Sequence, residues 1–219
     1  RGTKIHNLNV IYGFFKKFRP AGIKLFDFSV LKKQLSISLP IVFQSIVGSG
    51  SWFLFFVIIE NFIGEREVSI SNLLRGVYLM LMIPTWGLSS AINTIVSNVI
   101  GQKARSQVLP MIYKTSALSL GLPLIGMIVL AFWPQVLLGI GTNDSQLIAE
   151  SMEVRWVLIM SLALFSVSCI YFNGLAGTGA TKAGLLLQSL TVVFYFIYIY
   201  FIVLQMDSGL PVAWGSEFV

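Results

Sequence analysis

Long stretches without a charged residue, separated by short charged segments, divide this sequence. Five of them follow one another between Lys33 and Glu60, Arg75 and Lys103, Lys114 and Asp144, Arg155 and Lys182, and Lys182 and Asp207. About 20 apolar residues in a helix cross the hydrocarbon core of a bilayer, and each stretch is longer than that. The pattern therefore predicts an integral membrane protein that crosses the membrane several times.

The same stretches indicate helices. Inside a bilayer every backbone amide must pair within the protein, which leaves α-helices or a closed β-barrel. Barrel strands alternate polar and apolar residues, and the runs at 118–133 and 185–204 do not alternate. We predict an all-α, polytopic transmembrane helical bundle. Its spans are expected at about 34–59, 73–101, 108–140, 154–175 and 185–205, with the start of a sixth at 210–219.

The two ends of the sequence suggest its organisation. Residues 1–33 are basic and contain Gly and Pro, and they predict a cytoplasmic connector followed by an interfacial helix before a transmembrane bundle over 34–219. The apolar run Leu210-Pro211-Val212-Ala213-Trp214 follows a turn and predicts the opening of the sixth span. We therefore expect this sequence to be part of a longer chain.

Composition agrees with this class, since 56% of the residues are hydrophobic, 11% are charged and the formal net charge is +6. A cytoplasmic N-terminal segment would place most of the basic residues on the cytoplasmic side, as membrane proteins prefer. They are Arg1, Lys4, Lys16, Lys17, Arg19, Lys24, Lys32, Lys33, Lys103, Arg105, Lys114 and Lys182. Arg66, Arg75 and Arg155 would lie outside. We predict a multi-pass protein of the plasma membrane, the bacterial inner membrane.

Few residues offer catalytic or metal chemistry. Cys169 is the single cysteine, so no internal disulfide can form, and no metal-ligand spacing occurs. No nucleophile elbow, paired acids or HExxH pattern is present, so we do not expect an enzyme, a metal site or a cofactor. The basic rim explains the positive charge, and no basic stripe carries interleaved aromatics, so no nucleic-acid partner is expected.

Neutral polar residues and helix-disrupting residues gather inside the predicted spans. Small and hydroxyl side chains in membrane helices allow close packing and hydrogen bonds across a contact, which is the simpler interpretation for any single serine. A buried amide needs a partner or water, and a whole polar face suits an aqueous cavity. Our candidates for cavity lining are Gln44, Ser90, Asn93, Ser97, Tyr171 and Asn173. Those for kinks or packing are Pro40, Gly48, Pro84, Gly87 and Gly177.

Three segments resemble one transporter family. Ser38-Leu39-Pro40-Ile41 with Gln44 resembles the start of the seventh helix of multidrug and toxic compound extrusion (MATE) transporters. The stretch from Ile83-Pro84-Thr85-Trp86-Gly87 to Val99-Ile100-Gly101 is similar to their eighth helix, and 173–181 resembles the exit of their tenth.

The resemblance implies the second bundle of a two-bundle transporter. Such a protein exports amphipathic, cationic drugs or other xenobiotics in exchange for Na⁺ or H⁺, by alternating access. The partners implied are membrane lipid, the small cationic substrate and the N-terminal bundle of the same full-length chain. No cofactor beyond the coupling ion, Na⁺ or H⁺, is implied.

The sequence departs from the family pattern at charged positions. Gly48 stands where many members place a glutamate, and 164–166 lacks the acid that others carry. Ala176 and Ala180 replace the family's Arg and Asp. Because intramembrane carboxylates usually couple ions, we hypothesise that the coupling carboxylate lies in the other bundle. Gln44, Asn93 and Tyr171 would then form polar walls only.

Two other functions stay open. A lipid-linked oligosaccharide flippase of the same superfamily would share the helix count and orientation, but it should place cationic residues inside the cleft, where we expect none. A channel would also suit a polar face, and it would dissipate a gradient instead of using one. A membrane-embedded enzyme lacks visible chemistry.

Overall fold

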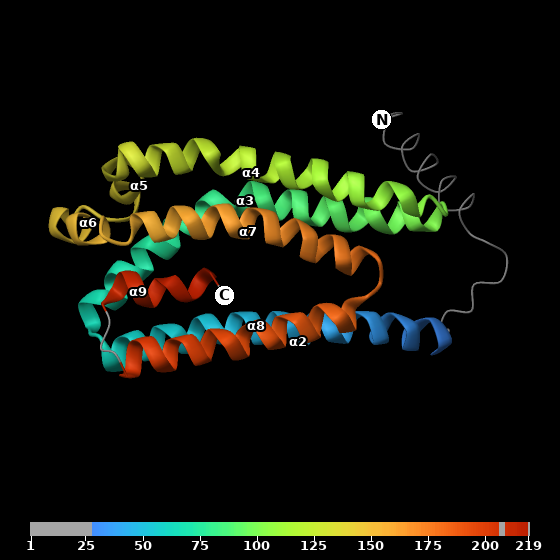
Figure 1. Cartoon of the computed structure of the whole chain (residues 1–219), viewed down its shortest axis with the longest axis horizontal. Helices are drawn as coiled ribbons and strands as arrows, with labels where there is room; N and C mark the ends of the chain where they lie inside the picture. Colours follow the sequence, from blue (N-terminus) through green and yellow to red (C-terminus); the bar gives the residue numbers. More distant parts are fainter. Residues whose placement is uncertain (1–27, 206–208, 219) are drawn as a thin grey trace, which may run out of the picture. The chain divides into compact units, whose positions relative to one another are not determined.

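The apolar stretches form helices throughout the computed structural model, which describes residues 28–205 and 209–218 (Figure 1). A helix pairs its own backbone groups, which hydrocarbon requires. Five helices are long and apolar enough to cross a membrane, and the described residues contain no strand. The prediction of an all-α transmembrane bundle is confirmed.

The long helices are α2 (Phe28–Phe62), α3 (Glu65–Gly101), α4 (Val108–Phe132), α7 (Arg155–Gly177) and α8 (Thr181–Ile199). Three shorter helices are α5 (Pro134–Gly141), α6 (Ser145–Ser151) and α9 (Leu210–Trp214). A 3₁₀ turn, η1 (Arg105–Gln107), precedes α4, and another, η3 (Gly215–Phe218), follows α9. The π-helical segment η2 (Tyr200–Gln205) prolongs α8. A helical segment therefore begins at 210, where the start of a sixth span is predicted.

Contacts divide the chain into two units, residues 1–36 and 37–219, and α2 passes from the first into the second. In the first unit, residues 1–27 of the predicted connector lie outside the described residues. Residues 28–36 form exposed turns of α2. The second unit contains the rest of the bundle, and the contacts below all lie within it.

The second and third predicted spans differ most from the helices. The second begins at Glu65 instead of 73, because Glu65 and Glu67 in the first turn suit the positive end of the helix dipole. The third ends at Phe132 instead of 140, since Pro134 disfavours helical geometry at Trp133, which has φ −132° and ψ 58°. Between α5 and α7 the chain forms α6, capped by the Asp144 side chain, which accepts from two backbone amides.

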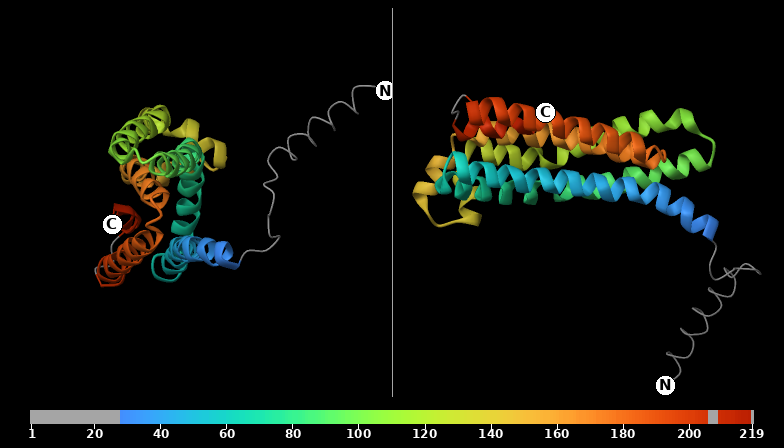
Figure 2. Two further views of the ribbon diagram at one scale, coloured as in Figure 1. Left: turned by 90° about the vertical axis from the view of Figure 1, so that its right-hand side faces the viewer. Right: turned by 90° about the horizontal axis from the view of Figure 1, so that it is seen from below.

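Helices α3, α4 and α7 pack closely (Figures 1 and 2). Small side chains make this possible: a Cβ on Gly174 would lie 2.7 Å from Ile112, and one on Gly177 would lie 2.6 Å from the Asn93 carbonyl oxygen. The Ser119 hydroxyl donates to the Ser166 carbonyl at 2.9 Å between α4 and α7. Short residues and hydroxyl bonds of this kind replace the hydrophobic effect as the cause of helix association in lipid.

Helices α2 and α8 run side by side, with Gly48 of α2 facing Gln188 of α8, and α9 lies next to α7 and η2 (Figures 1 and 2). Large side chains join α2 to α3 and α9. The Trp52 ring lies 6.1 Å from Tyr78 of α3 and 5.8 Å from Trp214 of α9. Trp214 is fully buried, and its Nε1 donates to the Ser71 hydroxyl at 3.1 Å.

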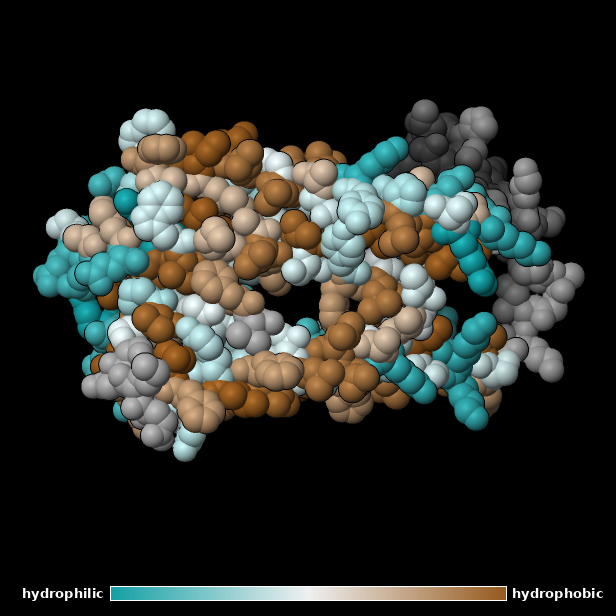
Figure 3. Space-filling view, viewed as in Figure 1, coloured by the Kyte–Doolittle hydropathy of each residue, from teal (hydrophilic) through white to brown (hydrophobic). Residues whose placement is uncertain are grey.

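On the face of the second unit drawn in Figure 3, hydrophilic residues gather toward the ends and hydrophobic residues cover much of the middle. Large exposed apolar side chains cover α4 and α8, among them Leu118, Ile125, Leu186 and Phe194. They are the side chains expected to meet lipid. Exposed apolar side chains along such helices are typical of a transmembrane bundle.

Gly177→Ala should weaken the α3–α7 contact, because the added methyl group meets a backbone oxygen that cannot move away. Overpacking of this kind costs about 1–3 kcal/mol. Gly87→Ala is the matched control, since nothing lies within 4 Å of its added Cβ. We expect thermal unfolding in detergent to shift downward for Gly177→Ala alone. Equal melting temperatures for the two variants would contradict this close approach.

Candidate functional site

One side of α3 is uncovered and polar. At 100° per residue, Gly87, Ser90, Ala91, Thr94 and Asn98 lie along one side of the helix, and all five are exposed. We call these residues the α3 polar face. Contacts with α7 hold the opposite side of the helix, where Ser89 and Val96 are buried. The α3 polar face is therefore a consequence of how α3 packs.

The α3 polar face differs from the other exposed helix surfaces. Leu118 and Ile125 of α4 and Leu187 and Val193 of α8 are exposed and apolar, as lipid requires. Ser, Thr and Asn side chains in hydrocarbon would have to find hydrogen-bond partners, and the Thr94 hydroxyl donates back to the Ser90 carbonyl of its own helix. This face suits water or another protein surface better than lipid.

The predicted lining residues of α3 separate into two positions. Ser90 is exposed on the α3 polar face. Asn93 is half-buried at its edge, and Ser97 donates to the carbonyl oxygens of Asn93 at 2.9 Å and Gly177 at 3.0 Å. Asn93 and Ser97 therefore also contribute to the contact between α3 and α7.

The other predicted lining residues contact neighbouring helices or their own helix. The Gln44 amide oxygen lies 3.6 Å from the Cβ position of Gly184 on α8. Tyr171 is exposed, and its ring packs edge-on against Tyr113 of α4 at 6.1 Å. Asn173 donates to the Cys169 carbonyl at 2.9 Å within α7. None of these contacts involves the α3 polar face.

The residues predicted for kinks and packing occupy varied surroundings. Pro40 is buried inside α2, and Pro84 is exposed inside α3. Gly48 faces Gln188 of α8, whose amide nitrogen lies 3.9 Å from its Cβ position. Gly87 has open space around it, and Gly177 is in the tightest of these contacts.

An open pocket of about 600 Å³ lies beside α3 near the α6 end of the bundle. Ser69, Asn72 and Gly76 line it on α3, and Leu137 of α5 and Leu147 of α6 line the opposite wall. The three α3 residues are exposed and continue the side of the helix that carries the α3 polar face. Small and polar residues therefore occur on this side in both halves of α3.

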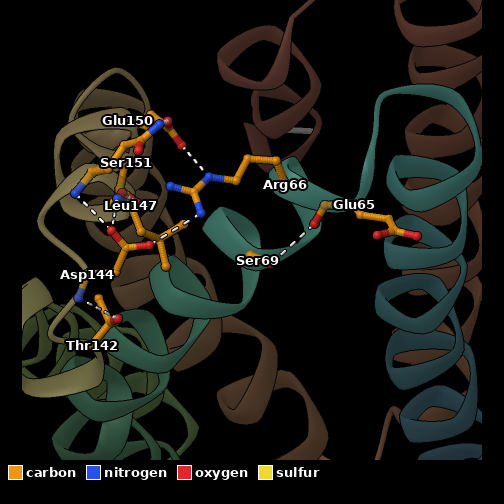
Figure 4. Close-up of polar contacts among 9 residues, drawn as sticks. Glu65, Arg66, Ser69, Thr142, Asp144, Leu147, Glu150 and Ser151 are labelled. Atoms are coloured by element: carbon orange, nitrogen blue, oxygen red, sulfur yellow. Dashed lines mark hydrogen bonds and ion pairs between the residues drawn. The ribbon is translucent and has the colours of Figure 1, made fainter.

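An ion-pair network ties the first turn of α3 to α6 (Figure 4). Arg66 donates to Glu150 at 2.7 Å and to Asp144 at 3.3 Å. The backbone amides of Leu147 and Gln146, and then Arg66, hold the pKa of Asp144 below its usual range. Hydrogen bonds from Arg66 and Gln146 lower the pKa of Glu150. The network fixes the short helix that forms one wall of the pocket.

Arg75 is a residue whose position the sequence did not reveal. It lies within α3, which begins earlier than the predicted span. Its guanidinium carbon lies 5.1 Å from the ring centre of Trp52 and 5.2 Å from that of Phe56, both on α2. Glu65 and Glu67, the two acids in the first turn, could have indicated from the sequence that the helix begins before the uncharged stretch.

The arrangement can present a polar helix face to water or to a partner and can hold polar molecules near it. Among residues 28–205 and 209–218, no group of His, Cys, Asp and Glu could hold a metal ion. The α3 polar face and the pocket beside α6 are the candidate surfaces for polar contacts.

Comparison with known families gives one match. Residues 40–204 match the model of the MatE family, which covers most of the chain. A search among curated proteins finds no match.

Acid should loosen α6. The pKa values of Asp144 and Glu150 are lowered in the folded protein. The two ionised carboxylates therefore stabilise the fold fully above the ordinary carboxyl pKa of about 4. This stabilisation is lost as the pH falls through the lower pKa values that the two groups have in the folded protein. We expect hydrogen-exchange protection of 145–151 to fall between pH 5 and about 2. Arg66→Gln should lower the protection of 145–151 already at pH 7. Unchanged protection of the wild type in acid would contradict the role of the ion-pair network in holding α6.

Proposed function

Because this chain belongs to the MatE family, it is a multi-pass membrane transporter, and we propose that it exports amphipathic, cationic drugs or other xenobiotics in exchange for Na⁺ or H⁺. The proposed site of action is the plasma membrane, the bacterial inner membrane. Transport would proceed by alternating access, in which two bundles rock around a central site.

The observation that carries this proposal is the α3 polar face. A helix that crosses the bilayer with Ser90, Thr94 and Asn98 exposed on one side is unfavourable against lipid tails. The same face is favourable as one wall of a water-filled path. Alternating access needs such a wall on each of two bundles.

We propose that the N-terminal bundle of a full-length chain stands opposite this face. Gly87 and Ala91 would allow close approach when the path is shut, because small residues let membrane helices come together. Ser90 and Thr94 would be wetted when the path opens. The α3 polar face thus suits a surface that is covered and uncovered in turn.

The coupling carboxylate is proposed to lie in that other bundle. Most acids of the described residues lie near helix ends, as Glu60, Glu65, Asp144 and Glu150 do, and they are exposed or half-buried. Gln44 and Asn93 carry no charge and would act as polar walls or packing residues. Glu217 differs in position, because it lies in η3 directly after α9, whose Trp214 is fully buried.

A flippase for a lipid-linked oligosaccharide is the second candidate, because Arg75 does place a cation within the bundle. A pyrophosphate would be attracted to the Arg75 guanidinium, which rests over the Trp52 and Phe56 rings. The match to the MatE family favours an exporter over this candidate. A channel stays possible on the polar face alone, and the energy requirement of transport separates it from an exporter.

Reconstituted vesicles test the function directly. We expect a fluorescent amphipathic cation to move against its concentration gradient only when an opposing Na⁺ or H⁺ gradient is applied. Collapse of that gradient with an ionophore should stop the movement, and protein-free vesicles supply the baseline. Rapid downhill flux that ignores the ion gradient would identify a channel and contradict the exporter.

Gln44→Ala combined with Asn93→Ala tests the placement of ion coupling. Neither side chain carries charge, so we expect the double variant to transport more slowly but still to depend on the ion gradient. Uptake rates with and without the gradient, together with a melting curve, measure both properties. A folded double variant that has lost all ion-driven transport would place coupling in this bundle.

A further inference from the structure

A second open pocket, of about 390 Å³, lies where α3 passes through η1 into α4 (Figure 1). Ile100, Val108 and Leu109 give it apolar walls. Arg105 of η1 adds a guanidinium, and Thr178, at the end of α7, adds a hydroxyl. This cavity, which we call the Arg105 pocket, lies at the opposite end of α3 from the pocket beside α6.

The turn that carries Arg105 is held by backbone hydrogen bonds. The Lys103 amide donates to the Ile100 carbonyl at 3.0 Å, and Lys103 itself adopts a positive φ of 61°, which closes the end of α3. The Gln107 amide donates to the Ala104 carbonyl, also at 3.0 Å. Arg105 is therefore presented from a defined turn, and a ligand would have to order only its side chain.

The charge around the Arg105 pocket has one sign. In the part of the chain that the structure describes, both salt bridges belong to Arg66, so Arg105 has no ion partner there. The stretches that flank the pocket, 98–116 and 172–186, contain no Asp or Glu. They contain three further cations, Lys103, Lys114 and Lys182. The pocket therefore attracts anions, and no carboxylate in these stretches repels them.

Two tyrosines indicate the depth of the pocket in the membrane. Tyr113 lies one turn after Leu109 on the same side of α4, and Tyr171 lies two turns before Thr178 on the same side of α7. Both are exposed, and their rings meet edge-on with centres 6.1 Å apart. Exposed tyrosines of membrane helices concentrate at the boundary between hydrocarbon and headgroups. The pocket, one to two turns beyond this pair, therefore lies at the level of lipid headgroups.

Apolar surface next to the guanidinium distinguishes a lipid from a free anion. Leu109 is 62% exposed although it lines the pocket, and Leu120 and Leu124 continue the same side of α4 toward the middle of the bundle. A free phosphate would contact Arg105 and leave this apolar strip uncovered. A phospholipid supplies a phosphate for the guanidinium and an acyl chain for the strip.

We propose that the Arg105 pocket binds one anionic phospholipid of the cytoplasmic leaflet. Its phosphate pairs with the Arg105 guanidinium, its glycerol lies beside Thr178, and one acyl chain runs along Leu109 and Tyr113. The basic residues of the sequence predict that this end is cytoplasmic, and anionic lipids are found in that leaflet. The site is separate from the α3 polar face, so this inference does not rest on the transported solute.

Phosphatidylglycerol and phosphatidylcholine with the same acyl chains isolate the net charge. Phosphatidylcholine carries a phosphate too, but its ammonium group is repelled by the cations around the pocket. The full-length protein in detergent is titrated with each lipid, and native mass spectrometry gives the dissociation constant of the first bound lipid. One charge-assisted contact changes affinity by about tenfold, so we expect the wild type to bind phosphatidylglycerol about tenfold more tightly.

Arg105→Gln should weaken phosphatidylglycerol binding about tenfold and remove most of the preference. Lys103→Gln is the matched control, because it removes the same charge two residues away at a position that does not line the pocket, and it should keep the preference. Phosphatidylglycerol should also raise the melting temperature of the wild type and of Lys103→Gln more than that of Arg105→Gln, since a ligand of the folded state stabilises it.

Leu109→Ser tests the acyl chain. It should weaken both lipids by a similar factor, about threefold, because either chain would lie on Leu109. Leu118→Ser is its control, since Leu118 is exposed on the opposite side of α4 and should have no effect on the first bound lipid. Equal effects of the two substitutions would contradict a chain seated on Leu109.

Glycerol 3-phosphate, which has the phosphate without acyl chains, separates the lipid from a soluble anion. In large excess it should leave the binding of phosphatidylglycerol unchanged, and full displacement would assign the pocket to a soluble phosphate and overturn the inference. A wild type that binds the two lipids equally would also overturn it, even if Arg105→Gln fails to fold. So would equal losses in Arg105→Gln and Lys103→Gln, which would show attraction by net charge alone.

Discussion

The contact between α3 and α7 is the interaction on which the rest of this bundle depends. Gly177 brings α7 against the backbone of α3, where a Cβ would come within 2.6 Å of the Asn93 carbonyl oxygen. Ser97 reinforces the contact with a 3.0 Å hydrogen bond to the Gly177 carbonyl oxygen. Because α7 occupies this side of α3, the side that carries Ser90 and Thr94 remains uncovered, and the transport proposal follows from that exposure.

The two halves of α3 serve different purposes. Its second half packs through small residues against α4 and α7, while its first half meets α2 through Trp52 and Phe56. Large side chains bridge a wider space than glycines do, so the first half can accommodate Arg75 among aromatic rings. Packing density thus explains why Arg75 and the α3 polar face lie at different levels of one helix.

The sequence predicted the class and the number of long helices because hydrocarbon leaves few choices to an uncharged stretch of this length. Helical periodicity places Ser90, a predicted lining residue, on the same side of α3 as Thr94. The sequence did not predict the break at Trp133, where the ring of Pro134 outweighs continuous hydropathy. The depth of Arg75 and the position of Glu217 depend on helix ends and on contacts between distant segments, which periodicity does not encode.

The central claim is that the α3 polar face does not meet lipid. A nitroxide spin label at position 94, in a Cys169→Ser background within nanodiscs, measures this through its collisions with oxygen, which concentrates in lipid, and with a water-soluble nickel chelate. Ile125 on α4 is the reference, because it is exposed and apolar. The structure predicts that the label at Thr94 collides with oxygen far less than the label at Ile125 does. Equal, high oxygen collision at both positions would show that the face meets lipid and would contradict the transport path proposed along it.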